Sequence, residues 1–407
     1  MATLSAASAA DLPGRSLQGT VEDVEFWSNY LVPRFEAYLS EAGSYNTEQQ
    51  AAHVACLRAA LPGLGPKPPH PQWKITLAYN GLPIELSINL SEDRGPIVRF
   101  YLEPVSREIG TDRDPIGESA FLASFSRLVP EMTSVDAQWF HHLSEVFGLK
   151  DQSEFDAAKA RTRAEAPVPK GFMGVDFACG TRSLKCTFCP LQKFFARGGG
   201  WDNLPDLNKG VVDAIRTLPG ASAVMGQSLD RLEKYLFQAP CGQVGRGDTR
   251  CRECAKMNRP NSFFNLVSVD CADPSKARVK LYYRIQCNAF ACIRDAVTLG
   301  GRLTDDKTLE GLRRLQAVWH LLVNDPESQE SDDHCRPWNV ERLRQGIDIN
   351  WEFSGRTSAP ETKVYVPVYM FHKNDDEVNR NLNTVFKKLN WNNWADGRYA
   401  RLLHKVV

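Results

Sequence analysis

The chain of 407 residues lacks an excess of charge of either sign, because 49 lysine and arginine residues balance 49 aspartate and glutamate residues. It has no run of lysine or arginine, so the basic surface that binds nucleic acid is not expected. Residues 1–13 are small and polar, without the basic start and apolar stretch of a secretion signal. No uninterrupted apolar segment is long enough to span a bilayer. We therefore expect a soluble cytoplasmic protein that binds neither nucleic acid nor membranes.

The cysteines do not indicate a disulfide framework. Eleven of them, an odd number, occur in a long chain without a secretion signal, which is typical of reduced thiols. Two C-x-x-C pairs have the spacing of zinc ligands, namely Cys186 with Cys189 and Cys251 with Cys254. Two more cysteines, Cys241 and Cys271, lie near the second pair in the sequence. A spacing of three residues on a strand points the first two thiols to opposite faces. Two interpretations of the second pair stay open: a loop with free thiols, or a zinc site that organises an interaction module.

Cationic and aromatic side chains alternate with apolar ones along four predicted strands. Because successive side chains of a strand point to opposite faces, Arg278, Lys280 and Tyr282 share one face. Similar polar faces recur on three other strands, with Arg99 and Tyr101, Lys185 and Thr187, and Lys363 and Tyr365. Cations bind diphosphate, and aromatic faces stabilise a carbocation. The pattern predicts a surface suited to transfer of an allylic cation from its diphosphate.

A solvated sheet face is the simpler interpretation of any one of these strands, since Lys, Arg and Tyr are ordinary residues there. Recurrence on four strands, with tyrosines on the polar face, favours a binding surface. An Asp-Asp-x-x-Asp motif is missing, because the aspartate pairs at 305–306, 332–333 and 375–376 each lack the third aspartate. A magnesium-bound diphosphate is therefore not implied.

The helical and strand patterns form a repeating unit of two helices and two strands. A capping box at Thr20 and Asp23 opens the first helix. Further helices are predicted over 47–60, 118–129, 135–147, 207–218, 228–237, 290–299, 309–323 and 377–389, and a last one runs through Tyr399 and Leu402. Strands are predicted around Glu85, Arg99, Gly174, Lys185, Leu266, Lys280, Ile349 and Tyr365. The helices cover the apolar face of the sheet, so we expect an α+β fold, an antiparallel barrel with its polar face inward.

Taken in this order, the motifs resemble those of the fungal aromatic prenyltransferases of the dimethylallyltryptophan synthase type. The resemblance runs from about residue 20 to residue 403, and its strongest pieces are LPIELSINL, IVRFYLEPV, RVKLYYR, TLGGRLTD and KVYVPVY. It implies the ααββ barrel, a ten-stranded antiparallel barrel inside a ring of helices. It also implies a single domain over residues 20–407, with a disordered tail at 1–19 and a Cys-, Gly- and Arg-rich loop insertion at 241–260.

The roles of the site residues follow from this resemblance. Glu85 resembles the acidic residue that binds the indole N–H and takes up the proton lost from the acceptor. The positions that hold the diphosphate match Arg99, Lys185, Arg278, Lys280 and Lys363. Tyr282 and Tyr365 match the tyrosine shield around the allylic cation. Thr187 stands where a shielding tyrosine is usual, which removes a ring from the pocket.

The resemblance implies transfer of a dimethylallyl group from dimethylallyl diphosphate to an aromatic acceptor, most readily an indole, in alkaloid-type secondary metabolism. No metal or other cofactor is required. The chain ends at Val407, where the family continues into a last strand pair with two further tyrosines. We therefore expect an open seam between the first and last strands, a wetter cavity, reduced activity, and self-association through strand edges, as in a homodimer. A catalytically impaired protein that binds aromatic ligands on the same barrel is the alternative.

Overall fold

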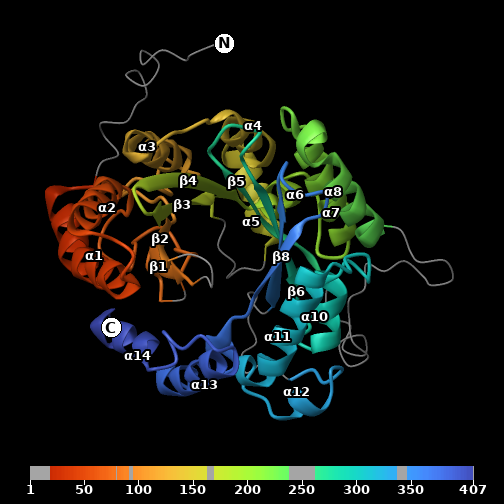
Figure 1. The fold of residues 1–407 in the computed structure, drawn as a ribbon. Coiled ribbons are helices and arrows are strands. Elements are labelled where there is room, and N and C mark those ends of the chain that lie inside the picture. The colour runs from red at the N-terminus through yellow and green to blue at the C-terminus, as the bar shows by residue number, and fades with distance from the viewer. Residues whose placement is uncertain are drawn as a thin grey trace. The chain divides into compact units, whose positions relative to one another are not determined.

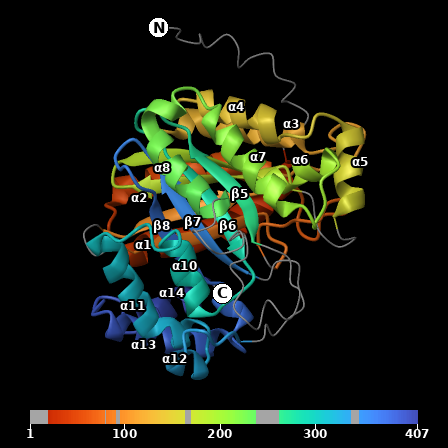
Figure 2. The ribbon, with the colours of Figure 1, turned by 90° about the vertical axis from the view of Figure 1, so that its right-hand side faces the viewer.

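The computed structural model describes residues 19–78, 80–90, 95–162, 169–237, 262–336 and 346–406 (Figures 1 and 2). The predicted tail, apart from Gly19, and the predicted loop insertion at 241–260 lie outside these ranges. The chain divides into two compact units, and the single domain expected over residues 20–407 stays a prediction. Within the described ranges, no helix is both long and apolar enough to cross a membrane.

The first unit comprises Met1–Arg197, Val269–Asp273 and Lys405–Val407. Its strands are β1 (Ile84–Asn89), β2 (Ile97–Leu102), β3 (Gly171–Ala178) and β4 (Thr181–Phe188). Its helices are α1 (Val21–Ala42), α2 (Thr47–Ala60), α3 (Glu118–Leu128), α4 (Gln138–Phe147), α5 (Gln152–Arg161) and α6 (Pro190–Ala196), with short 3-10 turns at Leu61–Gly63 and Val129–Glu131. The predicted capping box of the first helix is confirmed, because the Thr20 side chain accepts from the Asp23 amide and Asp23 accepts from the Thr20 amide.

The second unit comprises Gly198–Ser268 and Pro274–His404. Its strands are β6 (Val279–Ile285), β7 (Ile347–Phe353) and β8 (Glu361–Tyr365), and β5 (Phe263–Asp270) has residues in both units. Its helices are α7 (Leu204–Arg216), α8 (Ala221–Phe237), α10 (Phe290–Val297), α11 (Asp306–Leu322), α12 (Glu327–Glu330), α13 (Asp375–Lys388) and most of α14 (Arg398–Val406), with a 3-10 turn at Val368–Met370.

The strands follow one another in the sheet in chain order, from β1 to β8. In the first unit β1 pairs with β2, β2 with β3 and β3 with β4, and each pair is antiparallel. In the second unit β6 pairs with β7 and β7 with β8, again antiparallel. The predicted antiparallel α+β fold and its four strand pairs are therefore confirmed, whereas the seam between the first and last strands stays a prediction.

Helices cover the apolar face of the strands within each unit, as the sequence predicts. In the first unit Phe35 of α1 packs on Phe100 and Phe177, with ring centroids 6.4 and 5.2 Å apart, and Figure 1 shows α1 beside β1 and β2. In the second unit the buried Trp351 of β7 packs on Tyr235 of α8 at 6.0 Å and donates its indole N–H to the carbonyl of Ala296 in α10 at 3.3 Å. Figure 2 shows α8 and α10 against these strands. Polar side chains are left on the other face.

Two helices of the first unit are not among the predicted elements. Helix α5 buries only Ala158, so its sequence carries little of the apolar periodicity that predicts a helix. Helix α6 is short and begins at Pro190. In the second unit α8 begins at Ala221, earlier than the expected residue 228, because the small residues of its first turns hide the helical period.

Candidate functional site

A row of four side-chain positions crosses the polar face of the first unit. Glu85 on β1 is opposite Tyr101 on β2, Tyr101 is opposite Gly174 on β3, and Gly174 is opposite Lys185 on β4. In antiparallel strands, directly opposite residues point to the same face. The strand register therefore places the predicted proton acceptor and one predicted diphosphate-binding cation on one face of this unit.

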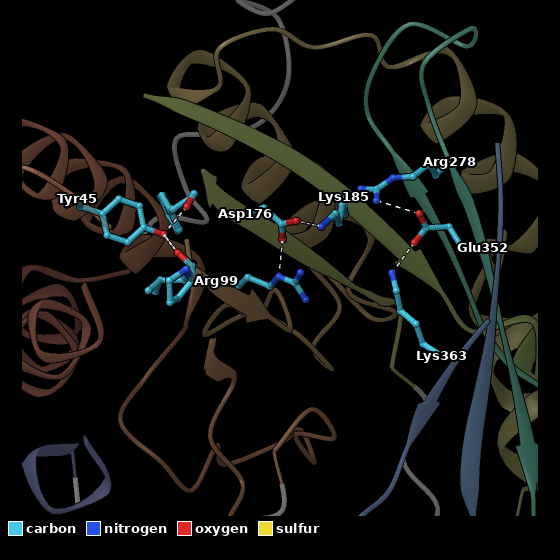
Figure 3. Close-up of polar contacts among 10 residues, drawn as sticks. Tyr45, Arg99, Asp176, Lys185, Arg278, Glu352 and Lys363 are labelled. Atoms are coloured by element: carbon cyan, nitrogen blue, oxygen red, sulfur yellow. Dashed lines mark hydrogen bonds and ion pairs between the residues drawn. The ribbon is translucent and has the colours of Figure 1, made fainter. Parts of the chain in front are cut away.

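Asp176 joins the two predicted diphosphate-binding cations of the first unit. It is directly opposite Arg99 in the register, and its Oδ1 atom lies 3.2 Å from Nε of Arg99. Its Oδ2 atom accepts from the ammonium group of Lys185, whose side chain is only 4% exposed. Figure 3 shows the carboxylate between the two cations. We call these three residues the Asp176 cluster, in which one carboxylate offsets part of two positive charges.

The side chain of Glu85 is exposed on its strand, yet the protein around it removes enough water to affect its ionisation. This desolvation raises the pKa of the Glu85 carboxyl above its ordinary value. A carboxylate with a raised pKa is a stronger base at neutral pH. The site thus contains a carboxylate that can accept a proton.

The aromatic ring of Tyr101 lies across Gly174, where any larger residue would collide with it. A Cβ atom added to Gly174 would lie 2.4 Å from Cε1 and 2.7 Å from Cζ of Tyr101. Tyr101 shares its polar face with Arg99 and belongs to the predicted surface of cations and aromatic rings, although no individual role was assigned to it. The strand alternation places it correctly, whereas the glycine that makes room for its ring becomes visible only through the register of β2 and β3.

Tyr45 secures the far end of the β2–β3 pair from the loop between α1 and α2. Its hydroxyl accepts from the Val98 amide at 2.8 Å and donates to the carbonyl of Phe177 (Figure 3). Val98 and Phe177 are themselves directly opposite each other, so a side-chain hydroxyl completes this step of the strand ladder. Burial is the main cause that raises the pKa of Tyr45 to about 12, so the hydroxyl keeps its proton.

In the second unit, Glu352 of β7 lies between predicted diphosphate-binding cations, as Asp176 does in the first unit. Its Oε1 atom lies 3.0 Å from Nη1 of Arg278, and its Oε2 atom lies 2.8 Å from Nζ of Lys363 (Figure 3). Lys280, which is only 5% exposed, is directly opposite Glu352 on β6. We call these four residues the Glu352 cluster. It brings together all three diphosphate-binding cations that the sequence predicts in this unit.

The charges of the Glu352 cluster determine the ionisation of its carboxylate. Burial alone would raise the pKa of Glu352, but the positive charges of Lys280, Arg278 and Lys363 and the hydrogen bond from Lys363 outweigh it. The pKa of Glu352 therefore lies below its ordinary value, and the group is an anion at neutral pH. Three cations facing one anion leave a net positive charge, which suits a dianionic or trianionic ligand.

The two predicted shield tyrosines also come together in the second unit. The rings of Tyr282 on β6 and Tyr365 on β8 have centroids 5.6 Å apart and an interplanar angle of 55°. The strand between them is β7, so the rings lean toward each other across it. Both rings are on the face that carries Lys280 and Lys363, next to the cations that would hold a diphosphate.

Asn350 lies on β7 between these groups, opposite Tyr282 on one side and Lys363 on the other. Its side chain is fully buried, and neither its Oδ1 nor its Nδ2 atom has a hydrogen-bond partner among the described residues. A role for Asn350 was not predicted, although the alternation of β7 places it on the polar face. It is the polar group of this face with most to gain from a ligand hydrogen bond.

The remaining positions singled out in the sequence are Thr187 and the cysteines with zinc-ligand spacing, and the structure describes only some of them. Thr187 is buried on β4, opposite Phe172, on the face of Lys185. Cys186 and Cys189 are both buried, and the Sγ atom of Cys186 lies 3.7 Å from Sγ of Cys271. Cys241, Cys251 and Cys254 lie outside the described residues. Where the structure describes the chain, no cluster of three or more His, Cys, Asp or Glu side chains is arranged to hold a metal ion.

Comparison with known proteins gives a consistent result. The family model described as tryptophan dimethylallyltransferase matches residues 23–401. The indole prenyltransferase tdiB of Emericella nidulans is 29% identical over 396 residues, which cover 94% of this chain and 88% of that protein. Tryptophan dimethylallyltransferase 1 of Claviceps purpurea is 26% identical over 374 residues, covering 91% of this chain and 78% of that protein.

Solved structures show the same fold. The crystal structure of AnaPT from Neosartorya fischeri has a TM-score of 0.74 and 22% identity, covering 94% of this chain and 85% of that one. The structure of NotF in complex with brevianamide F and DMSPP has a TM-score of 0.72 and 23% identity, covering 99% of this chain and 90% of that one. At these identities the likeness concerns the fold, and the roles of single residues are argued separately below.

Proposed function

This chain belongs to the tryptophan dimethylallyltransferase family, and we propose that it transfers a dimethylallyl group from dimethylallyl diphosphate to an indole acceptor. The observation that carries the proposal is the Glu352 cluster beside the paired rings of Tyr282 and Tyr365. A reaction that separates a diphosphate anion from an allylic cation requires cations beside aromatic rings, and this cluster provides both.

The donor would be held by its diphosphate. Within the second unit we assign this role to Arg278, Lys280 and Lys363, and we keep the same predicted role for Arg99 and Lys185 of the first unit. When the bond between C1 of the prenyl group and the diphosphate oxygen breaks, both electrons leave with the oxygen. Guanidinium and ammonium groups that are already in place stabilise the charge that develops there, without reorganisation during the reaction.

The allylic cation would be shielded by Tyr282 and Tyr365. The faces of aromatic rings carry partial negative charge, so they stabilise a nearby cation through the ring quadrupole. Thr187, on the face of Lys185, has a smaller side chain than the tyrosine that is usual at this position of the family. We propose that the smaller side chain at this position widens the range of acceptors that the site admits.

Glu85 would act on the acceptor. A carboxylate that accepts a hydrogen bond from the indole N–H raises the electron density of the ring, whose carbon then attacks one end of the allylic cation, C1 or C3. The new carbon–carbon bond leaves a cationic ring that returns to aromaticity by losing one proton, and the carboxylate takes up a proton from the acceptor. The raised pKa of Glu85 supports this role, because it makes the carboxylate a better base near neutral pH.

A panel experiment tests the proposal. The protein is incubated with dimethylallyl diphosphate and a series of indoles, phenols and cyclic dipeptides, and the products are analysed by mass spectrometry. We expect prenylated indoles, with much less product from simple phenols. Tight donor binding without any product would favour a binding protein on the same fold, and product from phenols alone would remove the indole assignment.

A further inference from the structure

We propose that Glu352 is a positioning residue and built-in counter-anion of the donor site, whose contacts the diphosphate takes over when it binds. The inference rests on the proposed function and deepens it, because it names a residue that sets how tightly the diphosphate is held. It concerns the second unit, whose cations surround this carboxylate.

Both oxygen atoms of the Glu352 carboxylate contact cations to which we assign binding of the donor diphosphate. Its side chain is only 6% exposed, and its two oxygen atoms contact two different cations, Arg278 and Lys363. The third cation, Lys280, faces it across the β6–β7 pair. Each contact is one that a phosphate oxygen would make in the same place, because both groups offer anionic oxygens to the same donors.

Charge explains why such a carboxylate is needed. Three cations on neighbouring strands repel one another, and the buried Lys280 also loses hydration, so an anion among them stabilises the folded protein. Glu352 supplies the anion while the donor is absent, and its lowered pKa keeps it charged. The cations are therefore held in position before the diphosphate arrives.

The same charge limits the affinity for diphosphate. Once the diphosphate is bound, Glu352 is a negative group close to a negative ligand, and the repulsion weakens binding. Inorganic diphosphate is a product and has to leave, so a moderate affinity serves turnover. Removing the charge of Glu352 should therefore destabilise the free protein and strengthen diphosphate binding.

Asp348 provides a matched control on the same strand. It lies on the same face of β7 as Glu352, directly opposite Arg284, and binds that guanidinium through two contacts of 2.6 and 2.9 Å. The side chain of Asp348 is 16% exposed and that of Glu352 is 6% exposed, so both carboxylates are largely buried. Arg284 is not among the donor-binding cations, so loss of this carboxylate should lower stability without changing diphosphate affinity.

The test compares wild type, Glu352→Gln and Asp348→Asn by thermal unfolding and by calorimetric titration with inorganic diphosphate. Glu352→Gln should unfold at a lower temperature without ligand, bind diphosphate about tenfold more tightly, and gain more thermal stability from it than wild type does. Asp348→Asn should unfold at a lower temperature and bind diphosphate as wild type does. Affinity of Glu352→Gln equal to or below that of wild type would overturn the inference.

Glu352→Asp covers the case in which the glutamine variant does not fold. It keeps the charge but withdraws it by one methylene from Arg278 and Lys363, so diphosphate binding should tighten by about two- to threefold. Binding that is unchanged or weaker in this variant would also overturn the inference. A wild-type protein that binds no diphosphate, in contrast, would refute the proposed function rather than the role of Glu352 alone.

Discussion

Tyr101 on β2 and Gly174 on β3 are directly opposite each other, and the tyrosine ring occupies the space that a side chain at position 174 would need. Glu85 and Lys185 flank this pair on the neighbouring strands. The glycine thereby leaves space for an aromatic ring between the strand of the predicted proton acceptor and the strand of a predicted diphosphate-binding cation. We infer that Tyr101 lines the acceptor side of the site.

Gly174→Ala should displace the Tyr101 ring and impair acceptor binding. An added Cβ at 2.4 Å from a ring carbon requires the ring to move, and we expect stability to fall by about 1–3 kcal/mol. The KM for the acceptor should rise more than the KM for the donor. Chemical denaturation and steady-state kinetics check both effects, and Tyr101→Ala added to the variant should restore part of the lost stability. A variant as stable as wild type would contradict the close packing.

Glu85→Gln should leave folding and diphosphate binding intact while lowering turnover by about two to four orders of magnitude, the usual scale for general acid–base groups. The amide keeps the shape of the carboxylate but cannot take up a proton. Steady-state turnover is compared with the affinity for inorganic diphosphate in the same variant. Turnover like that of wild type would remove Glu85 from the mechanism.

Charge reversal in Lys280→Glu should abolish donor binding. Lys280 is buried opposite Glu352, so the substitution brings two carboxylates together and turns attraction for the diphosphate into repulsion. Calorimetric titration with inorganic diphosphate measures the loss. Lys307→Glu, an exposed change on α11, serves as the control for altered net charge. Donor binding retained in Lys280→Glu would exclude this lysine from the site.

Prenyl transfer should continue in the presence of EDTA. Under the proposed function the donor diphosphate is bound by arginine and lysine side chains, such as Arg278 and Lys363, which would neutralise its charge without a bridging metal ion. Product formation is measured with and without chelator, and then with added magnesium. Complete loss of product in EDTA, restored by magnesium, would count against a donor site built from these cations.

Stability should fall as the pH is lowered from about 6.5 to about 4, because His53 stays neutral in the fold. Its ring is buried against Phe177, and burial lowers its pKa to about 4, well below its unfolded value of about 6.5. In that window the unfolded chain binds a proton that the folded chain does not, so the free energy of unfolding decreases with falling pH, by about 3 kcal/mol at most.

Denaturant unfolding at several pH values measures this dependence for wild type and for His53→Leu. The leucine variant should have a flatter profile between pH 4 and 6.5, because the group that titrates is gone. A profile of unchanged slope would show that His53 is not its source.

Much of the fold follows from the sequence because the periodicity of the strands is clear. The alternation around Lys280 places cations and Tyr282 on one face and buried residues on the other, and the structure confirms it. Asp176 and Glu352 also satisfy this alternation, but their role depends on which strand pairs with which and in what register. A single sequence does not contain that register, so the cations were predicted and their counter-anions were not.

Tyr45 has a consequence for the order of folding. Its hydroxyl joins the Val98 amide, 53 residues later in the chain, to a carbonyl 132 residues later. The step of the β2–β3 ladder at Val98 and Phe177 is therefore complete only when the segment between α1 and α2 has docked on both strands. Such long-range closure is slow compared with the formation of a helix or a hairpin. We therefore expect this step of the ladder, on the strand that carries Arg99, to form late in folding, once the segment that carries Tyr45 has docked.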